Sequence, residues 1–141
     1  MADVATRLEA LIAASSFHRR LGFRIEQVRS GFARVRLPYN EANTTARSAL
    51  HGGAIAATAD LAATLAAWSG DELSPAQVAG RTLSCDVNYL AGALGEDIFG
   101  EAEVLRRGKE VVFSGVHVLN GAGKVLAVAN HVFHLCPKSA T

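Results

Sequence analysis

The stretch AIAATADLAATLAA at residues 54–67 decides the fold of this chain. Eight of its fourteen residues are alanine, the strongest helix former, with Ile55, Leu61 and Leu65 between them. Because apolar residues occupy every side of such a helix, we expect it to be buried all round. The rest of the chain must therefore enclose it.

The chain before this helix predicts one more helix and a hairpin. Residues 3–18 carry apolar side chains at helical spacing. Residues 23–28 and 32–37 are expected to be two strands joined by a tight turn, and the second strand alternates apolar residues with arginine. A polar, irregular loop at residues 38–50 then leads into the long helix.

Four strand-like segments follow the long helix, after an expected surface connection at residues 69–77. The breaks between them carry glycine-containing turn sequences that are compatible with antiparallel hairpins. The segments are residues 81–90, 98–106, 111–119 and 125–135. The pattern predicts an α+β fold, in which an antiparallel sheet wraps around one long buried helix and a second helix lies at the N-terminus.

Length and composition exclude several classes of protein. The 141 residues fit a single domain, residues 1–141, and 50% hydrophobic against 19% charged residues argues against disorder. An aromatic content of 6% and a net charge of +1 are poorly suited to nucleic-acid binding. The sequence has neither a signal peptide nor a stretch approaching the ~20 apolar residues of a membrane span, so we expect no membrane association and a cytoplasmic location.

The expected sheet also bears on assembly. Residues 111–119 are interpreted as a long outer strand, and a cytosolic protein usually covers such an edge or joins it to another subunit. We therefore expect an oligomer. The two cysteines, Cys85 and Cys136, are interpreted as unpaired thiols.

His51-Gly52-Gly53 lies where the polar loop meets the long helix. The first backbone N–H groups of a helix have no partner within it and carry the positive end of its dipole, and glycine lets an oxygen-bearing ligand approach. This motif predicts an anion or oxyanion site. The alternative is an ordinary helix cap with flexible glycines.

Asp60 is the only charged side chain between positions 51 and 71. A carboxylate in a buried helix loses hydration, which disfavours its charged form unless partners compensate. Asp60 therefore has either a chemical function or a structural one. In the structural alternative, its carboxylate faces a solvated crevice or pairs with an arginine such as Arg47 or Arg81. Gly52 and Asp60 are about 12 Å apart along the helix axis, so one site that uses both calls for a second subunit.

The segment HGGAIAATAD at residues 51–60 resembles the signature of hot-dog-fold acyl-CoA thioesterases of the phenylacetyl-CoA thioesterase type, and the resemblance extends over residues 23–135. It implies a hot-dog fold and hydrolysis of an acyl or aryl thioester to the free acid and CoA. It also implies a homodimer, assembled into a tetramer as a dimer of dimers, with active sites at subunit interfaces. No cofactor is required, because CoA is part of the substrate.

The resemblance also implies roles for four residues. Asp60 resembles the catalytic carboxylate, which acts as a general base or as a nucleophile. Gly52 resembles the glycine whose N–H binds the thioester oxygen, and His51 resembles the histidine that orients the loop or polarises the carbonyl. Thr82 falls where the family has a serine or threonine that reaches in from the neighbouring subunit to hold the attacking water.

Arg106, Arg107 and Lys109 form a compact basic turn that we expect to bind the phosphates of CoA, and Gly53 joins this predicted binding set. The alternative is a charged hairpin tip that only keeps the protein soluble. No metal site is predicted, because the strand histidines at positions 131 and 134 are three residues apart and so face opposite sides.

One departure from the family pattern leaves alternatives open. The family often has an asparagine six residues before the histidine, where this chain has Thr45, and Asn43 lies two residues further away. Either the loop turns Asn43 inward or its contact is missing, which would fit a non-catalytic acyl-CoA-binding or regulatory protein. A hot-dog dehydratase or hydratase would need a paired histidine and acidic residue, and the position of Asp60 argues against it.

Overall fold

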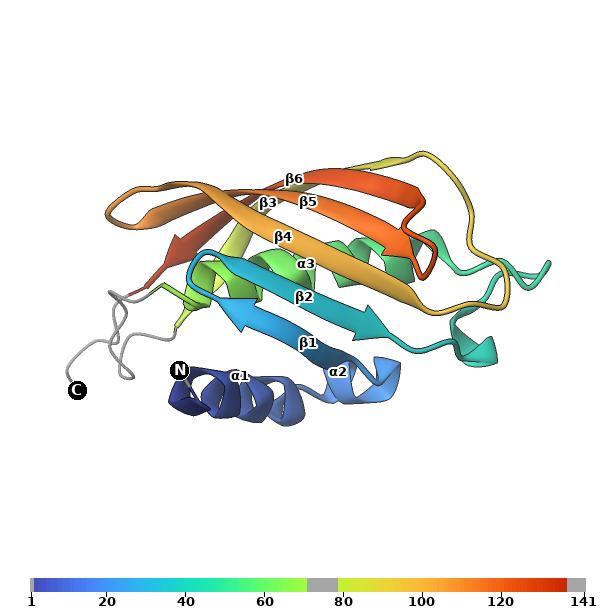
Figure 1. Cartoon of the computed structure of the whole chain (residues 1–141), viewed down its shortest axis with the longest axis horizontal. Helices are drawn as coiled ribbons and strands as arrows, with labels where there is room; N and C mark the ends of the chain where they lie inside the picture. Colours follow the sequence, from blue (N-terminus) through green and yellow to red (C-terminus); the bar gives the residue numbers. More distant parts are fainter. Residues whose placement is uncertain (1, 71–78, 137–141) are drawn as a thin grey trace.

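The chain folds into a six-stranded antiparallel sheet that curves over one long helix (Figure 1). The computed structural model describes residues 2–70 and 79–136, so most of the expected connection at 69–77 lies outside the described residues. The elements are α1 (Ala2–Ala14), α2 (Ser16–Leu21), β1 (Arg24–Arg29), β2 (Phe32–Leu37), the 3-10 helix η1 (Glu41–Asn43), α3 (Gly52–Trp68), β3 (Gly80–Tyr89), β4 (Ile98–Arg107), β5 (Val111–Asn120) and β6 (Val125–Leu135).

The alanine-rich helix α3 lies against the concave face of the sheet. Ten of its 17 residues are buried, and the small alanine side chains let the backbones come close. A Cβ added at Gly100 of β4 would lie 3.0 Å from the Thr58 carbonyl oxygen, so a side chain there would crowd the helix where it crosses this strand. Burial is not complete, however: a half-exposed or exposed stripe at helical spacing includes Gly53, Ala57 and Asp60. The expectation that α3 is buried all round is therefore wrong for this stripe.

The strand order is β1-β2-β4-β5-β6-β3. The hairpins β1–β2, β4–β5 and β5–β6 are as predicted, but β3 does not form a hairpin with β4. It crosses to the far side of the sheet and pairs with β6. The predicted outer strand, β5, therefore lies inside the sheet, and the two edges are β1 and β3.

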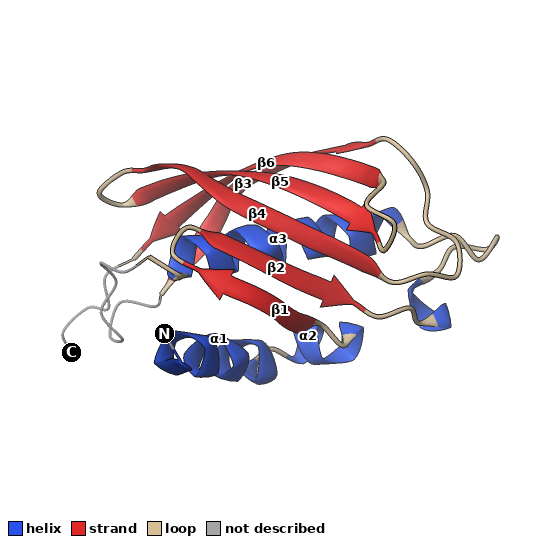
Figure 2. Ribbon diagram, viewed as in Figure 1, coloured by secondary structure: helices blue, strands red, loops and turns tan. Residues whose placement is uncertain are grey.

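The predicted N-terminal helix is broken into two. Ser15 caps α2 by accepting a hydrogen bond from the His18 N–H, and Gly22 ends α2 in the left-handed conformation with φ 78°. Leu8 and Ile12 of α1 join the main core, so this segment runs beside the β1 edge (Figure 2). In the described ranges, no helix is long and apolar enough to cross a membrane.

Candidate active site

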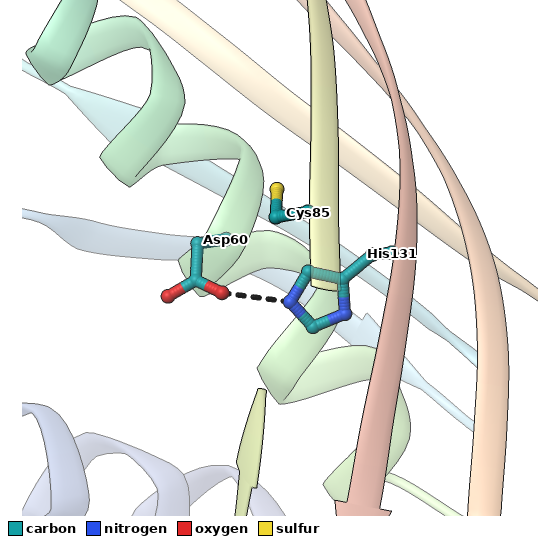
Figure 3. Close-up of side chains that lie close together, drawn as sticks. All are labelled: Asp60, Cys85 and His131. Atoms are coloured by element: carbon teal, nitrogen blue, oxygen red, sulfur yellow. Dashed lines mark hydrogen bonds and ion pairs between the residues drawn. The ribbon is translucent and has the colours of Figure 1, made fainter. Parts of the chain in front are cut away.

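Asp60 lies halfway along α3 in a small hydrogen-bonded cluster (Figure 3). The Thr82 hydroxyl donates to Asp60 Oδ1 at 2.7 Å, and His131 Nε2 lies 2.7 Å from the same oxygen. The His131 side chain is fully buried, whereas 43% of the Asp60 side chain is exposed. The cluster therefore joins α3 to β3 and β6 and presents a carboxylate at the surface.

A β-bulge turns Thr82 toward the helix. Cys85 and Val87 of β3 pack against the core, so strict alternation along the strand would point Thr82 to the opposite face. The pairing of β3 with β6 shifts register between Thr82 and Ser84, and such a shift exchanges the faces of the residues on either side of it. Thr82 reaches α3, while Leu83 stays 51% exposed.

The hydrogen bonds to Asp60 favour its ionised form. Burial alone would raise its pKa, but the hydrogen bonds from His131 and Thr82, with smaller electrostatic contributions, outweigh burial and hold the pKa below its ordinary value of 3.8. Both donors contact Oδ1, and among the described residues Oδ2 has no hydrogen-bond partner. Oδ2 is therefore the oxygen that is left to act on a ligand.

His131 belongs to this cluster although no local sequence pattern marks it. Its ring stacks on Phe133, with centroids 6.3 Å apart, and its Nδ1 is buried without a partner in the described part of the chain. The 2.7 Å contact with the Asp60 carboxylate requires a proton on Nε2, because a carboxylate oxygen accepts hydrogen bonds. In this form His131 is a fixed hydrogen-bond donor to Asp60.

Cys85 completes a set of three potential metal ligands, since its sulfur, an Asp60 oxygen and a His131 nitrogen lie within 4.8 Å of one another (Figure 3). Burial, followed by the charges of Asp60 and Asp86, raises the pKa of the Cys85 thiol to about 11. The sulfur is therefore a protonated thiol in the metal-free protein and not a thiolate nucleophile. A metal on His131 Nε2 would also move the ring proton to the unpartnered Nδ1. These groups fit a hydrogen-bonded cluster better than a metal centre.

The start of α3 forms a second polar site. His51 caps the helix, because its Nδ1 accepts the Gly53 N–H at 2.8 Å. The Gly53 N–H, part of the predicted binding set, is thus occupied. Within the described ranges, the Gly52 N–H has no acceptor, so it is an unpaired donor at the positive end of a 17-residue helix.

The two glycines at this site have different reasons to be glycine. A Cβ at Gly52 would meet only the Tyr89 ring, at an ordinary 3.5 Å, so the fold does not require glycine there. A Cβ at Gly53 would lie 3.0 Å from His51 Nδ1 and would disturb the cap. Gly52 therefore leaves room for a ligand, whereas Gly53 serves the geometry of the helix start.

The loop before α3 brings Asn43 beside His51. The Asn43 carbonyl accepts the His51 N–H at 2.8 Å, and both residues line a cavity of about 300 Å³. Asn43 Nδ2 is buried and has no partner among the described residues. Thr45, which stands where the family often has asparagine, lies on an exposed turn instead.

The two polar sites are separate within one chain. Gly52 and Asp60 are eight residues apart on the same helix, or about 12 Å along its axis. Thr82 donates to Asp60 of its own chain, so these two residues lie together on one subunit, and the role of Thr82 in holding water for a neighbouring subunit stays a prediction. Neither Arg47 nor Arg81 pairs with Asp60 in the part of the chain that the structure describes.

The basic side chains at the turn between β4 and β5 point in two different directions. Arg106 and Lys109 line an open cavity of about 690 Å³ beside the half-exposed ring of Phe113. Arg107 instead donates to the Ala67 carbonyl at 3.0 Å, at the C-terminal end of α3, where a cation is favourable. The three cations predicted to bind CoA therefore do not form one cluster.

Comparison with known proteins places this fold and site in a family. The model of the thioesterase superfamily matches residues 48–127. Human acyl-coenzyme A thioesterase 13 is 33% identical over 132 residues, which are 91% of each protein. The structure of zebra fish thioesterase superfamily member 2 has a TM-score of 0.80 and 29% identity, over 94% of this chain and 96% of that chain. The E. coli PaaI protein, from the phenylacetic acid degradation operon, shares the fold, with a TM-score of 0.80 and 19% identity over the same shares of the two chains.

A six-stranded antiparallel sheet curved around one long helix is the hot-dog fold, as the family resemblance implied. The chain belongs to the thioesterase superfamily and is a thioester hydrolase.

Proposed function

We propose that this protein hydrolyses acyl-CoA thioesters, with an aliphatic or aromatic acyl group, to the free acid and CoA. The observation that carries the proposal is the Asp60 carboxylate. His131 contacts its Oδ1 (Figure 3) and Thr82 donates to the same oxygen, while Oδ2 stays open. The name of the human relative, an acyl-coenzyme A thioesterase, supports CoA as the carrier. CoA enters as part of the substrate, and the proposal requires no further cofactor.

In the proposed reaction, Asp60 either takes a proton from the water that attacks the thioester carbonyl carbon, or attacks that carbon itself to form an acyl anhydride, which water then hydrolyses to the free acid. The carbonyl oxygen gains negative charge, the carbon–sulfur bond breaks, and the proton taken from water returns to the CoA sulfur. The Gly52 N–H stabilises the developing oxyanion, and the Asn43 amide supplies a second donor. His51 holds the helix start in place through its cap.

We place the active site between two subunits of a homodimer, so that Asp60 of one subunit faces Gly52 of the partner subunit. This arrangement overcomes the separation of about 12 Å along one helix. The half-exposed stripe on α3 and the free edge of β3, with exposed Leu83 and Tyr89, offer surfaces for such contact. Two dimers then assemble into a dimer of dimers, and the cytoplasm is the proposed location.

Arg106 and Lys109 are the proposed contacts for the CoA phosphates. Both line the open cavity at the β4–β5 turn, where two cations can pair with phosphate oxygens. Arg107 is assigned a structural role instead, since its guanidinium binds the end of α3.

The pair formed by Asp60 and His131 also raises the possibility of a dehydratase or hydratase, which moves a proton at carbon. His131 is poorly placed for that chemistry. Its side chain is fully buried, Nε2 is engaged with Asp60, and Nδ1 does not reach the surface. We therefore assign His131 the role of a positioning residue for a hydrolytic carboxylate.

A thiol-release screen with short, medium, long and aromatic acyl-CoAs tests the proposal. We expect turnover by the wild-type protein and a loss of roughly 10³-fold or more in Asp60→Asn, whose amide can neither attack nor accept a proton. Glu103→Gln, at an exposed position on β4 away from the β3 edge, is the matched control and should keep full activity. Retained hydrolysis in Asp60→Asn would contradict the proposal. Saturable acyl-CoA binding without thiol release would instead indicate a binding protein.

A further inference from the structure

The cavity beside the start of α3 is walled by a segment that the catalytic proposal does not use. Its volume is about 300 Å³. Phe17 and Leu21 of α2 form one side, and Asn43 lies in the loop opposite. His51 and Ala54 line it from α3, so the cavity begins where the thioester oxygen is proposed to bind.

Phe17 is 57% exposed although it lies in an ordered helix. None of the six residues of α2 is buried, and the helix is held by its caps, Ser15 and Gly22, rather than by packing of Phe17. Leu21, by contrast, packs against the main core. The Phe17 ring is therefore free to contact a ligand without a change in the fold.

We propose that this cavity receives the acyl group of the substrate and that Phe17 limits the length of that group, an inference that rests on the proposed thioesterase function. With the carbonyl oxygen at Gly52 and Asn43, one of the two substituents of the thioester must enter the cavity. The lining is mostly apolar, with Phe17, Leu21 and Ala54 beside the polar residues at the helix start, which suits an acyl group better than the amide-rich arm of CoA.

The size of the cavity narrows the substrate class. Ligand pockets span about 300–1,000 Å³, and this cavity of about 300 Å³ lies at the lower limit. A compact acyl group, a short to medium chain or a single ring, fits that volume, and a long fatty acyl chain would extend past Phe17 into water. The class proposed is therefore compact acyl-CoAs.

Kinetics with a ladder of acyl-CoAs test this inference. The substrates are acetyl, butyryl, hexanoyl, octanoyl, decanoyl, palmitoyl, benzoyl and phenylacetyl CoA, and kcat/KM is measured for each with the full-length protein. In the wild type, each methylene buried in the cavity should raise kcat/KM by about fourfold, until the chain reaches Phe17. Phe17→Ala should move the optimum to longer chains, and Phe17→Trp should move it to shorter ones. Leu105→Ala, an exposed apolar residue on β4 away from the cavity, should leave the profile unchanged.

Product inhibition by free CoA distinguishes an effect of Phe17 on binding of the acyl group from an effect on binding of CoA. If the cavity holds the acyl group, CoA inhibition stays the same in both Phe17 variants. An unchanged chain-length optimum in both variants, or a change in CoA inhibition as large as the change in kcat/KM, would overturn the inference and leave the proposed function intact. Absence of turnover with every acyl-CoA in the wild type would overturn the proposed function itself.

Discussion

The two polar sites on α3 are built in opposite ways. At the helix start, His51, Gly52 and Gly53 are contiguous, and their chemistry comes from the backbone: one N–H is capped and another is left free. At the middle of the helix, the chemistry comes from side chains that are far apart in sequence. Thr82 and His131 are 22 and 71 residues from Asp60 and meet it only in the folded chain.

This difference means that the two sites make different contributions to the proposed thioester hydrolysis. The helix start offers a hydrogen-bond donor and positive potential, which stabilise negative charge on an oxygen. The helix middle offers an oriented negative charge, which in the proposed reaction either attacks the thioester or activates water. Because neither region can perform hydrolysis alone, removing either one should abolish most activity, but for different reasons and with different dependence on pH.

The larger effect is expected from removing the free N–H at the helix start. Proline is tolerated at the first position of a helix, and the residue before it, His51, already has the extended backbone that proline requires, with φ −64° and ψ 135°. Gly52→Pro should therefore fold normally and lose roughly 10²–10³-fold in kcat, as expected for loss of an oxyanion donor. Steady-state kinetics and a thermal melt measure the two properties.

Gly52→Ala is the matched control for this substitution. It keeps the N–H and adds a methyl group that meets only the Tyr89 ring, so it should retain more activity than Gly52→Pro. Equal activity of the proline variant and the wild type would remove the Gly52 N–H from the mechanism.

A smaller effect is expected at the helix middle from Thr82→Val. Loss of one hydrogen bond to a charged group should lower kcat/KM by roughly ten- to hundredfold. The same hydrogen bond helps to hold the pKa of Asp60 below its ordinary value, so its loss raises that pKa. In the wild type, activity should fall only as pH drops below 3.8, the ordinary value, and in Thr82→Val this acid limb should move to higher pH.

Thr82→Ser keeps the hydroxyl and should restore both the rate and the acid limb. A pH–rate profile of kcat/KM for the three proteins measures this shift. A valine variant with a reduced rate but an unshifted acid limb would show that Thr82 acts on the water or the substrate rather than on the Asp60 charge.

Most of the fold could be predicted from the sequence because its elements follow local patterns. The alanine-rich run, the alternation in residues 32–37 and the glycine-containing turns each act over a few residues. Strand order does not follow from local patterns. The segment after β3 has the residues of a turn, which predicts a hairpin with β4, yet β3 pairs with β6 on the far side of the sheet. The break at Ser15 was not predicted, although serine is a common N-cap and the apolar spacing ends at Ile12.

The residues of the candidate site also fall into those that a local sequence pattern reveals and those that only the folded chain brings together. Gly52 and His51 were found because three adjacent residues form a motif, and Asp60 stood out as a single charge in an apolar helix. His131 lies in an alternating strand with nothing local to mark its contact. The orientation of Thr82 depends on a bulge, which changes the face of a side chain without leaving a pattern in the sequence. Arg107 was grouped with its neighbours, although β4 directs it to the end of α3.

The central claim, that the helix start of one subunit works with the helix middle of the other, is tested most directly by mixing two inactive variants. Asp60→Asn and Gly52→Pro are co-expressed in equal amounts, and each is also assayed alone. In a symmetric dimer, every mixed pair contains one intact site and one doubly altered site, so random pairing should restore about one quarter of wild-type activity. If each site lay within a single chain, every chain would carry a lesion, and activity no greater than that of the separate variants would contradict the account.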